Sequence, residues 1–407
     1  MELGNLGVTA AKGFQAAGGC AGIKKNNTKD MAMIYSTVPC VAAGTFTTNQ
    51  VKAAPVLWDR HIVYECEKAQ AVVINSGIAN AATGKEGYEA CEKTAEAAGV
   101  ALKIPMDSVF VASTGVIGAQ IPVDKITAGI DMLVPLLSDS REAASVAAHA
   151  IMTTDTRSKE VSVTVQIGGK DVTIGGMCKG AGMIHPNMCT MLSFITTDAA
   201  ITKPLLQKAL SGVVSDSYNM ISVDGDTSTN DTCLVMANGL AGNPEISEEG
   251  EDYRIFAGAL AEVNQALAKM IAGDGEGATR LFEVKVIHAE SKEQAVTLAK
   301  SIVTSSLTKA AIFGRDANWG RILCAMGYSG APFNVETVDL YFESKAGKIQ
   351  ITENSVATDY SEEEATRILS EDAVTAIADI KMGEEQATAW GCDLTFDYVK
   401  INADYRS

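Results

Sequence analysis

The hydrophobic and polar positions of this chain follow two different periods. Residues 70–77 (QAVVINSG) and 108–118 (SVFVASTGVIG) are short β-branched runs that end in Ser/Gly turns. Residues 85–103, between them, repeat apolar positions at helical spacing. Residues 160–176 alternate apolar and polar positions on either side of Gly168 and Gly169, which predicts a β-hairpin.

The second half of the chain mixes the same two periods. Amphipathic helices are predicted over residues 203–221, 252–273, 291–311 and 362–380, with Gly273 as a C-cap. Strands are predicted over residues 281–289, 338–352 and 392–402. Runs of strands mixed with helices indicate an α+β fold of layered sandwiches with mixed sheets flanked by helices, and not a doubly wound sheet. At 407 residues, two domains or one large two-lobed unit are expected.

Composition narrows the possible partners. The chain is 47% hydrophobic and 20% charged, as in ordinary globular proteins, and its net charge is −17. Nucleic acid is therefore not expected as a partner, because its binding requires a basic surface. The N-terminus lacks the charge pattern of a signal peptide, and no run of 18 apolar residues occurs. We expect a cytoplasmic protein without a membrane partner.

The reactive side chains give no metal or nucleotide signature. The nine cysteines form no C-x-x-C pair, so they are expected to be reduced and buried. The four histidines do not stand at ligand spacing, so no metal is expected. The glycine-rich nucleotide motifs and the G-x-S-x-G nucleophile motif are also missing.

The stretch KGAGMIHPNMCTMLSFITTDAA, residues 179–200, gives the most direct indication of chemistry. A glycine-rich turn and Pro186 lead to Thr190, which begins an apolar, β-branched run after the small residue Cys189. A threonine hydroxyl needs a base, and cutting the Cys189–Thr190 bond would supply one as the α-amine of Thr190. That amine titrates near pH 7.7–8.0, roughly where a general base is effective. A simpler interpretation is a β-forming residue at the start of a strand.

Other short stretches offer groups that an acyl transfer requires. Thr114 and the backbone N–H of Gly115, in STGVIG, could stabilise an oxyanion at a strand end, or could form a plain turn. Glu276 lies among glycines in GDGEGATR and could pair with a substrate ammonium, or belong to a flexible linker. Arg315 and Arg321 flank a tryptophan and could hold a carboxylate, although a structural role is favoured.

Seven segments in order resemble the ornithine acetyltransferase family, the self-cleaving glutamate N-acetyltransferases of arginine biosynthesis. They are GVTAAKGFQAAGGCAGIK, STGVIG, IMTTDT, KGAGMIHPNMCTMLSFITTDA, DGEGATR, GRDANWGRI and NADYRS, and they span nearly the whole chain. The resemblance implies the two-lobed α/β fold of that family. It also implies an α chain of residues 1–189 that carries the oxyanion-hole segment, and a β chain of residues 190–407 that begins with the nucleophile.

The resemblance assigns roles to individual residues. Thr190 is implied as the nucleophile, with cleavage between Cys189 and Thr190, and Thr114 and Gly115 as the oxyanion hole. The implied substrate contacts are Lys179, Thr153 or Thr154 with Thr153 preferred, Thr190, Glu276, Asn402 and Ser407. The last residue, Ser407, replaces the threonine common in the family but keeps a hydroxyl.

The implied reaction moves an acetyl group from N-acetylornithine to Thr190 and then to glutamate, giving ornithine and N-acetylglutamate. One amide replaces another, so neither metal nor cofactor is needed, with acetyl-CoA as a possible second acetyl donor. The implied assembly is an α2β2 heterotetramer. An alternative enzyme is an N-terminal-nucleophile amidohydrolase or aminopeptidase, in which water accepts the acyl group. A non-catalytic alternative is an intact binding protein.

The first prediction concerns self-cleavage. Purified wild-type protein should consist of two fragments, residues 1–189 and 190–407, whereas Thr190→Ala should stay uncut because it lacks the attacking hydroxyl. Intact mass and N-terminal sequencing, with the second fragment beginning Thr-Met-Leu, provide the measurement. A single uncut chain in active wild-type protein would contradict the prediction.

Overall fold

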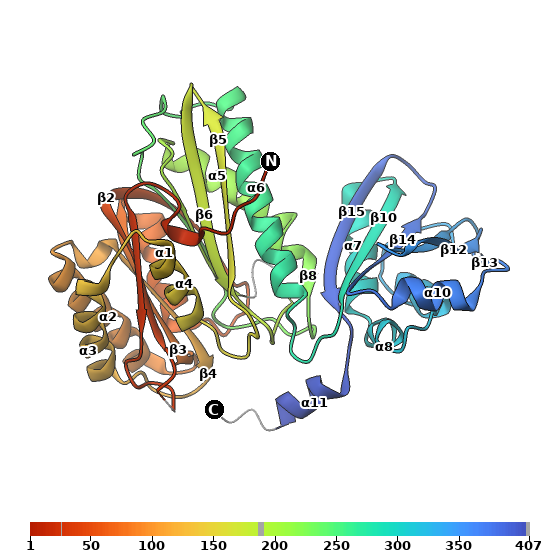
Figure 1. Ribbon diagram of the computed structural model, residues 1–407, viewed down its shortest axis with the longest axis horizontal. Helices are drawn as coiled ribbons and strands as arrows, with labels where there is room; N and C mark the ends of the chain where they lie inside the picture. Colours follow the sequence, from red (N-terminus) through yellow and green to blue (C-terminus); the bar gives the residue numbers. More distant parts are fainter. Residues whose placement is uncertain (26, 186–190, 404–407) are drawn as a thin grey trace.

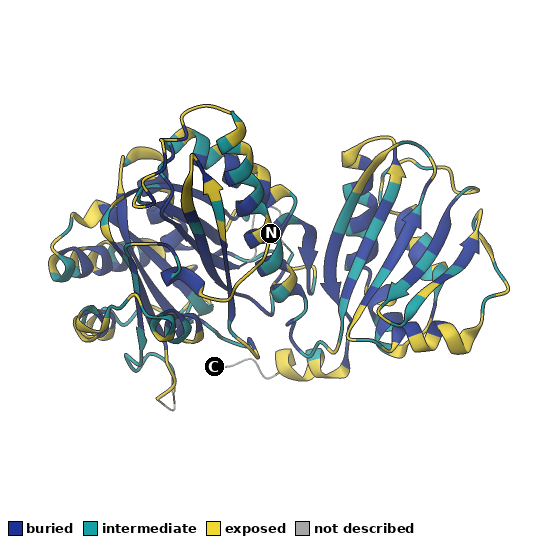
Figure 2. Ribbon diagram, turned by 45° about the horizontal axis from the view of Figure 1, so that its top comes forward, coloured by how far each residue is buried: buried dark blue, intermediate teal, exposed yellow. Residues whose placement is uncertain are grey.

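The computed structural model describes residues 1–25, 27–185 and 191–403, and the chain folds into two lobes (Figure 1). Each lobe contains a β-sheet covered by helices, and the strands are more buried than the outer helices (Figure 2). One apolar core is formed mainly by the first 151 residues, with contributions from β6, β7 and β9, and a second core extends from the larger lobe into the smaller one. The predicted α+β fold with mixed, helix-flanked sheets is confirmed.

The sheet of the larger lobe has eight strands within the described residues, in the order β4-β3-β2-β9-β7-β6-β5, with β1 paired to β2. Its strands are β1 (Phe14–Gly19), β2 (Met31–Phe46), β3 (Ala69–Ile78), β4 (Val109–Val116), β5 (Lys159–Ile167), β6 (Lys170–Lys179), β7 (Leu192–Thr197) and β9 (Thr232–Ala237). The long strand β2 joins the two halves of this sheet, because its first part pairs with β1 and β3 and its second part pairs with β9.

Six α-helices of the described chain belong to the larger lobe. They are α1 (Ala54–Glu65), α2 (Gly84–Leu102), α3 (Val123–Leu133), α4 (Arg141–Ala150), α5 (Lys203–Ser215) and α6 (Glu251–Ala272). α4 packs against β1 and β2, and α6 packs against β5 and β6. In α6, Phe256, Leu260, Val263 and Leu267 recur at helical spacing and are buried, so this face covers the sheet.

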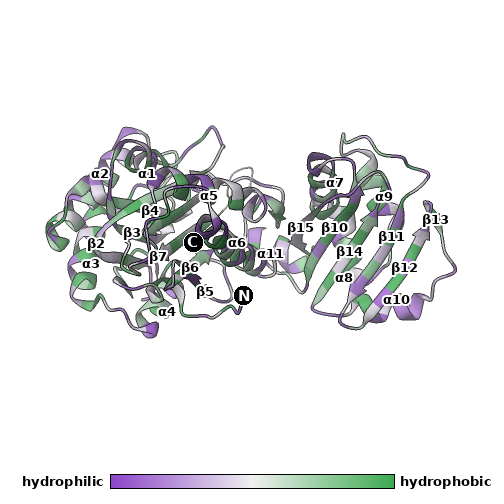
Figure 3. Cartoon of the chain, turned by 90° about the horizontal axis from the view of Figure 1, so that it is seen from above, coloured by the Kyte–Doolittle hydropathy of each residue, from purple (hydrophilic) through white to green (hydrophobic). Residues whose placement is uncertain are grey.

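The smaller lobe contains a sheet in the order β13-β12-β11-β14-β10-β15-β8. Its strands are β8 (Ile221–Ser222), β10 (Leu281–Ala289), β11 (Asp339–Ser344), β12 (Gly347–Glu353), β13 (Val356–Ala357), β14 (Ala373–Asp379) and β15 (Glu385–Cys392). The helices that follow β10 along the chain are α7 (Lys292–Thr304), α8 (Ser306–Gly314), α9 (Trp319–Gly327), α10 (Glu362–Leu369) and α11 (Phe396–Ala403). Apolar residues concentrate on the strands, and hydrophilic ones on outer helices such as α10 (Figure 3).

Most elements predicted in the first half of the chain are confirmed. The strand–helix–strand unit corresponds to β3, α2 and β4, and the hairpin corresponds to β5 and β6. The glycines that were expected to turn this hairpin, Gly168 and Gly169, both have positive φ angles, of 55° and 75°. Gly273 caps α6 as predicted.

Four predictions in the second half are wrong in part. Residues 203–221 were predicted as one helix, but α5 ends at Ser215 and Ile221 begins β8. Residues 392–402 were predicted as a strand, but β15 ends at Cys392 and most of the segment forms α11. Residues 362–380 were predicted as one helix, but α10 ends at Leu369 and the rest contributes β14, which pairs with both β10 and β11. The helix predicted over residues 291–311 is divided at Ser305 into α7 and α8.

The two lobes do not coincide with the chains implied by cleavage after residue 189. β6 pairs with β7 in antiparallel fashion, from Ile174 opposite Thr197 to Lys179 opposite Leu192. β7 in turn pairs with β9, and β9 pairs with β2. The two strands that follow residue 189, β7 and β9, therefore lie between strands that precede it in one sheet of the larger lobe.

Among the described residues, no helix is both long and apolar enough to cross a bilayer.

The second prediction concerns the break between α7 and α8. The Ser305 hydroxyl caps α8 by accepting a hydrogen bond from the Thr308 backbone N–H at 3.3 Å. Ser305→Ala should therefore lower the free energy of unfolding by about 1 kcal/mol. Urea denaturation followed by circular dichroism measures the change. The neighbouring exposed residue gives the control Ser306→Ala, and equal stabilities of the two variants would contradict this capping role.

Candidate active site

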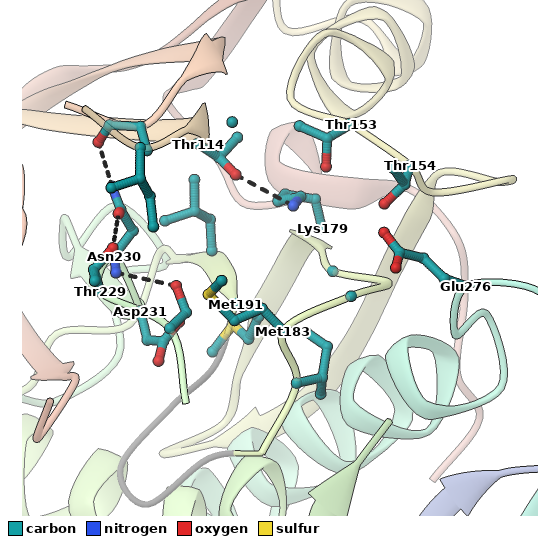
Figure 4. A pocket seen from close by; sticks show the side chains of 18 of the residues that line it. Thr114, Thr153, Thr154, Lys179, Met183, Met191, Thr229, Asn230, Asp231 and Glu276 are labelled. Atoms are coloured by element: carbon teal, nitrogen blue, oxygen red, sulfur yellow. Dashed lines mark hydrogen bonds between the residues drawn. The ribbon is translucent and has the colours of Figure 1, made fainter. Parts of the chain in front are cut away.

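A cavity of about 140 Å³ gathers side chains from widely separated parts of the sequence. Its lining includes the described residues to which the resemblance assigned a catalytic or substrate-contact role: Thr114, Gly115, Thr153, Lys179, Glu276 and Asn402, together with the alternative Thr154. Figure 4 labels Thr114, Thr153, Thr154, Lys179 and Glu276 among the side chains around it. Cys189, Thr190 and Ser407 lie outside the described residues. Met191, the residue directly after Thr190, also lines the cavity.

The oxyanion-hole candidates lie where two parallel strands end. β3 and β4 run in parallel, with Gly77 opposite Gly115 and Ser76 opposite Thr114. Gly115 has a φ of 132°, and a Cβ at this position would collide with the backbone of Gly77. Only glycine fits there, so the chain can turn while Thr114 and Gly115 both face the cavity.

Lys179, at the end of β6, is the cation next to Thr114. Its Nζ donates a hydrogen bond to the Thr114 hydroxyl at 3.3 Å. Burial lowers the pKa of Lys179 from its usual value, and the opposing negative charges of Asp155 and Glu276 reduce this shift. The lysine therefore places a buried hydrogen-bond donor beside the hydroxyl at which an oxyanion could form.

A buried cluster of charged side chains lies next to the cavity and contacts its wall. Lys159 Nζ is 2.6 Å from Asp155 Oδ1 and 2.6 Å from Asp274 Oδ2. Burial alone would raise the pKa of Asp155, but the charges of Lys179 and Lys159 outweigh it and lower that pKa to about 2. Asp155 also accepts hydrogen bonds from the backbone N–H groups of Thr153 and Gly180, both in the cavity wall.

The carboxylate of Glu276 enters the cavity from the loop that follows α6. It is largely buried, and Asn402 of α11 donates a hydrogen bond to its Oε2 at 2.7 Å. A Cβ on Gly182 would occupy the space that the Glu276 carboxyl group fills. The expected pairing of Glu276 with a ligand ammonium agrees with this position, because burial strengthens such an ion pair.

Two polar neighbours in the cavity wall were missed by the sequence analysis. Asn230 donates to the carbonyl oxygens of Ala79 at 2.6 Å and Ser113 at 2.8 Å, which ties the ends of β3 and β4 to the start of β9. Asp231 follows it and is 1% exposed. The surrounding sequence, TSTNDT, contains no recognisable catalytic spacing, so no local signal pointed to either residue.

The arginines that were considered for carboxylate binding lie outside the cavity lining. Arg315 occupies a left-handed position at the end of α8, with a φ of 57°. Arg321 donates to the carbonyl oxygen of Leu307 at 2.8 Å. Both arginines therefore shape the turn between α8 and α9, in agreement with the structural role favoured from the sequence.

The described residues contain no group of three or more His, Cys, Asp or Glu side chains that could hold a metal ion. The eight cysteines among them are all unpaired, and five are buried. Burial raises the pKa of the Cys178, Cys233 and Cys392 thiols, so these groups remain protonated at neutral pH.

A buried lysine, a strand-end hydroxyl and a glycine around a small polar cavity are groups that an acyl-transferring enzyme can use to stabilise an oxyanion. The ArgJ family model matches residues 15–407, and the chain belongs to this family. Among its relatives, the arginine biosynthesis bifunctional protein ArgJ 1 of Clostridium acetobutylicum is 53% identical over 406 residues, covering 100% of this chain and 98% of the relative. The ArgJ protein of Caldanaerobacter subterraneus subsp. tengcongensis is 51% identical over 407 residues, covering 100% of both chains.

A solved structure agrees with this membership. The crystal structure of the arginine biosynthesis bifunctional protein ArgJ from Bacillus halodurans shares 49% sequence identity and a TM-score of 0.50. The match covers 52% of this chain and 97% of that chain. The resemblance seen in the sequence is thus confirmed, and so is the predicted enzyme class, an acetyltransferase of arginine biosynthesis.

The third prediction concerns the space reserved for Glu276. Gly182→Ala should displace the Glu276 carboxylate and raise KM for a cationic substrate by about tenfold, the cost of a weakened ion pair. Steady-state kinetics measure the change, with circular dichroism to confirm folding. Gly212→Ala is the control, because a Cβ at that position on α5 meets no atom within 4 Å. A Gly182→Ala enzyme with wild-type KM would contradict the prediction.

Proposed function

We propose that the chain cuts itself between Cys189 and Thr190, and that Thr190 then carries an acetyl group from N-acetylornithine to glutamate. The observation that carries this proposal is the cavity itself. It brings together Thr114 and Gly115, Thr153 and Thr154, Lys179, Glu276 and Asn402, which are distant in sequence. A chance gathering of these residues at one small cavity would be improbable if the cavity were only structural.

The length of the Bacillus halodurans chain supports the cleavage. That chain is covered almost completely by a match to 52% of this one, so it is about half as long. Half-length chains are what a cut near the middle produces. The cut is proposed to give an α chain of residues 1–189 and a β chain of residues 190–407.

The first half-reaction transfers the acetyl group to the enzyme. The α-amine of Thr190 takes the hydroxyl proton as the hydroxyl oxygen attacks the acetyl carbon. Thr114 and the N–H of Gly115 stabilise the oxyanion, helped by the hydrogen bond that Lys179 donates to Thr114. When the amide bond breaks, the proton passes to the departing nitrogen of ornithine.

The second half-reaction reverses these steps with glutamate as acceptor. The amine of glutamate attacks the acetyl-threonine ester, and the Thr190 amine takes a proton from it and returns one to the threonine oxygen. Substrate is held by Glu276, whose carboxylate pairs with an ammonium group, and by Asn402, Ser407, Lys179 and Thr153 or Thr154. Neither half-reaction involves oxidation, reduction or phosphate cleavage, so we propose that no metal or cofactor takes part.

The wider setting follows from the relatives. Because the relatives are named bifunctional, we propose acetyl-CoA as a second acetyl donor to glutamate. The proposed working form is an α2β2 heterotetramer in the cytoplasm.

The fourth prediction tests the acceptor and the oxyanion hole in one assay. Enzyme incubated with N-acetylornithine and glutamate should form N-acetylglutamate and ornithine in equal amounts, as measured by liquid chromatography and mass spectrometry. Thr114→Ala should lower kcat by about 10²–10³-fold with little change in KM, because it removes an oxyanion donor. The exposed hydroxyl of β5 provides the control Thr164→Ala.

Two outcomes would overturn these assignments. Release of acetate in place of N-acetylglutamate would identify a hydrolase, the alternative enzyme class. A Thr114→Ala variant with a raised KM and an unchanged kcat would make Thr114 a substrate contact and not part of the oxyanion hole.

A further inference from the structure

The ends of β3 and β4, which carry the oxyanion-hole candidates, are not held by the regular strand ladder. The parallel register is regular as far as Gly77 opposite Gly115, and it then shifts at Ile78, which pairs with two residues of β4. Gly77 and Gly115 both have positive φ angles, of 108° and 132°. Because glycine adopts many backbone conformations, groups other than the ladder must fix this part of the chain.

The side-chain amide of Asn230 provides the first anchor. Its Nδ2 donates to the carbonyl oxygen of Ala79, just after β3, at 2.6 Å, and to that of Ser113, in β4, at 2.8 Å. An asparagine amide has two N–H donors, so both are taken by the backbone. Asn230 lines the cavity, yet it is buried. Its donors therefore act on the protein and not on a substrate.

A neighbouring hydroxyl sets the orientation of this amide. Thr229 Oγ1 donates to Asn230 Oδ1 at 2.7 Å, so the amide nitrogen faces the two carbonyl oxygens. The backbone of Thr229 is fixed in turn, because its carbonyl oxygen accepts a hydrogen bond from the Ala53 N–H, at the N-terminus of α1, at 2.9 Å. Figure 4 shows Thr229 and Asn230 together at one end of the cavity, with Glu276 at the other.

Asn75 of β3 gives the same stretch of β4 a second anchor. The Ser113 hydroxyl donates to Asn75 Oδ1 at 2.7 Å, and Asn75 Nδ2 donates to the Ile78 carbonyl oxygen at 2.9 Å. Asn75 and Ser113 are both buried. The residue before Thr114 is thus held by one amide at its side chain and by another at its carbonyl group.

We propose that Asn230 is a positioning residue of the oxyanion hole: its amide keeps the end of β4 where the Thr114 hydroxyl and the Gly115 N–H meet the developing oxyanion. This inference rests on the oxyanion-hole roles proposed above. The Ser113 carbonyl oxygen and the Thr114 nitrogen belong to one planar peptide group, so anchoring the oxygen fixes where residue 114 begins. Donors stabilise an oxyanion strongly only when they are already aimed at its position.

The anchor acts on both halves of the proposed reaction. An oxyanion forms when the acetyl amide is attacked, and again when the amine of glutamate attacks the acetyl-enzyme. Loss of the anchor should slow both steps to a similar extent and leave the binding of either substrate nearly unchanged. Asn230 itself gives and takes no proton, so its effect is on kcat and not on KM.

The fifth prediction tests this anchor with Asn230→Asp, which keeps the size of the side chain but places an oxygen opposite the two carbonyl oxygens. Its kcat should fall about 10²-fold, as on loss of an oxyanion donor, with both KM values within about twofold of the wild type. Steady-state kinetics measure both parameters, and thermal unfolding measures stability.

Asn243→Asp is the matched control. Asn243, in the loop after β9, is also buried, and its Nδ2 donates to the carbonyl oxygens of Ala200 at 3.1 Å and Pro244 at 2.7 Å. It is not part of the cavity lining. The control should lose stability as Asn230→Asp does, because both changes remove the same kind of contact, but it should keep the wild-type kcat.

A double-mutant cycle separates positioning from general stabilisation. Thr229→Val removes the hydroxyl that orients the amide, so kcat should fall about tenfold, and Thr229→Ser should restore it. In a Thr114→Ala background, Thr229→Val should lower kcat only about threefold or less, because one of the aimed donors is already gone. A contribution to stability alone would give the same fold-change in both backgrounds.

Three results would overturn the inference: wild-type kcat in a folded, cut Asn230→Asp enzyme, a raised KM with unchanged kcat, or equal effects of Thr229→Val in both backgrounds. If Asn230→Asp stays uncut or unfolded, the Thr229 variants decide by the same criteria. Wild-type kcat in Thr114→Ala would instead refute the proposed oxyanion hole, and the anchor with it. The failure of the anchor alone is therefore distinguishable from failure of the proposed function.

Discussion

The buried contact of Lys159 with Asp155 and Asp274 is the interaction on which the cavity depends. Asp155 lies in the segment after α4, Asp274 lies in the loop after α6, and Lys159 begins β5. Through Asp155 the cluster fixes the backbone of Thr153 and Gly180, and through Asp274 it holds Thr156. Charges this deeply buried are stable only in such a network, so removing one would leave its partners uncompensated. The cluster thus anchors the loop that carries Glu276, two residues after Asp274.

The sequence revealed the parts of the site that form short, ordered motifs, and it missed the parts that do not. Thr114 and Glu276 were found in short stretches of the sequence, and Lys179 and Asn402 through the family resemblance. The described structure brings all four to one cavity. Lys159, Asn230 and Asp231 lie in ordinary strand or loop sequences, and their importance comes from partners distant in the chain. Long-range pairing of this kind leaves no local spacing to recognise. Thr190, Cys189 and Ser407 lie outside the described residues, so their roles remain predictions.

The fold was predictable where the hydrophobic period was long and unambiguous, as in α6 and in the β5–β6 hairpin. The prediction for β14 was wrong because its alanines favour a helix, whereas pairing with β10 and β11 on both sides overrides that local preference. The strand predicted in place of α11 was wrong because the apolar residues Leu394, Phe396 and Tyr398 alternate with polar ones, as they would in a strand. Phe396 is 84% exposed, so no core contact enforces the alternation. Both errors arise where tertiary contacts, or their lack, override the local pattern.

The pairing of β6 with β7 has a consequence for the lifetime of the protein. A cut after residue 189 interrupts no strand pairing among the described residues, and the ladders on both sides keep the two fragments interlocked. A cut molecule that unfolds, however, must find its other half again, and that encounter depends on concentration in a way that the first folding of a single chain does not. An enzyme cut after residue 189 therefore folds readily only once, as a single chain before the cut. Its persistence depends on slow unfolding, a kinetic form of stability, more than on ready refolding.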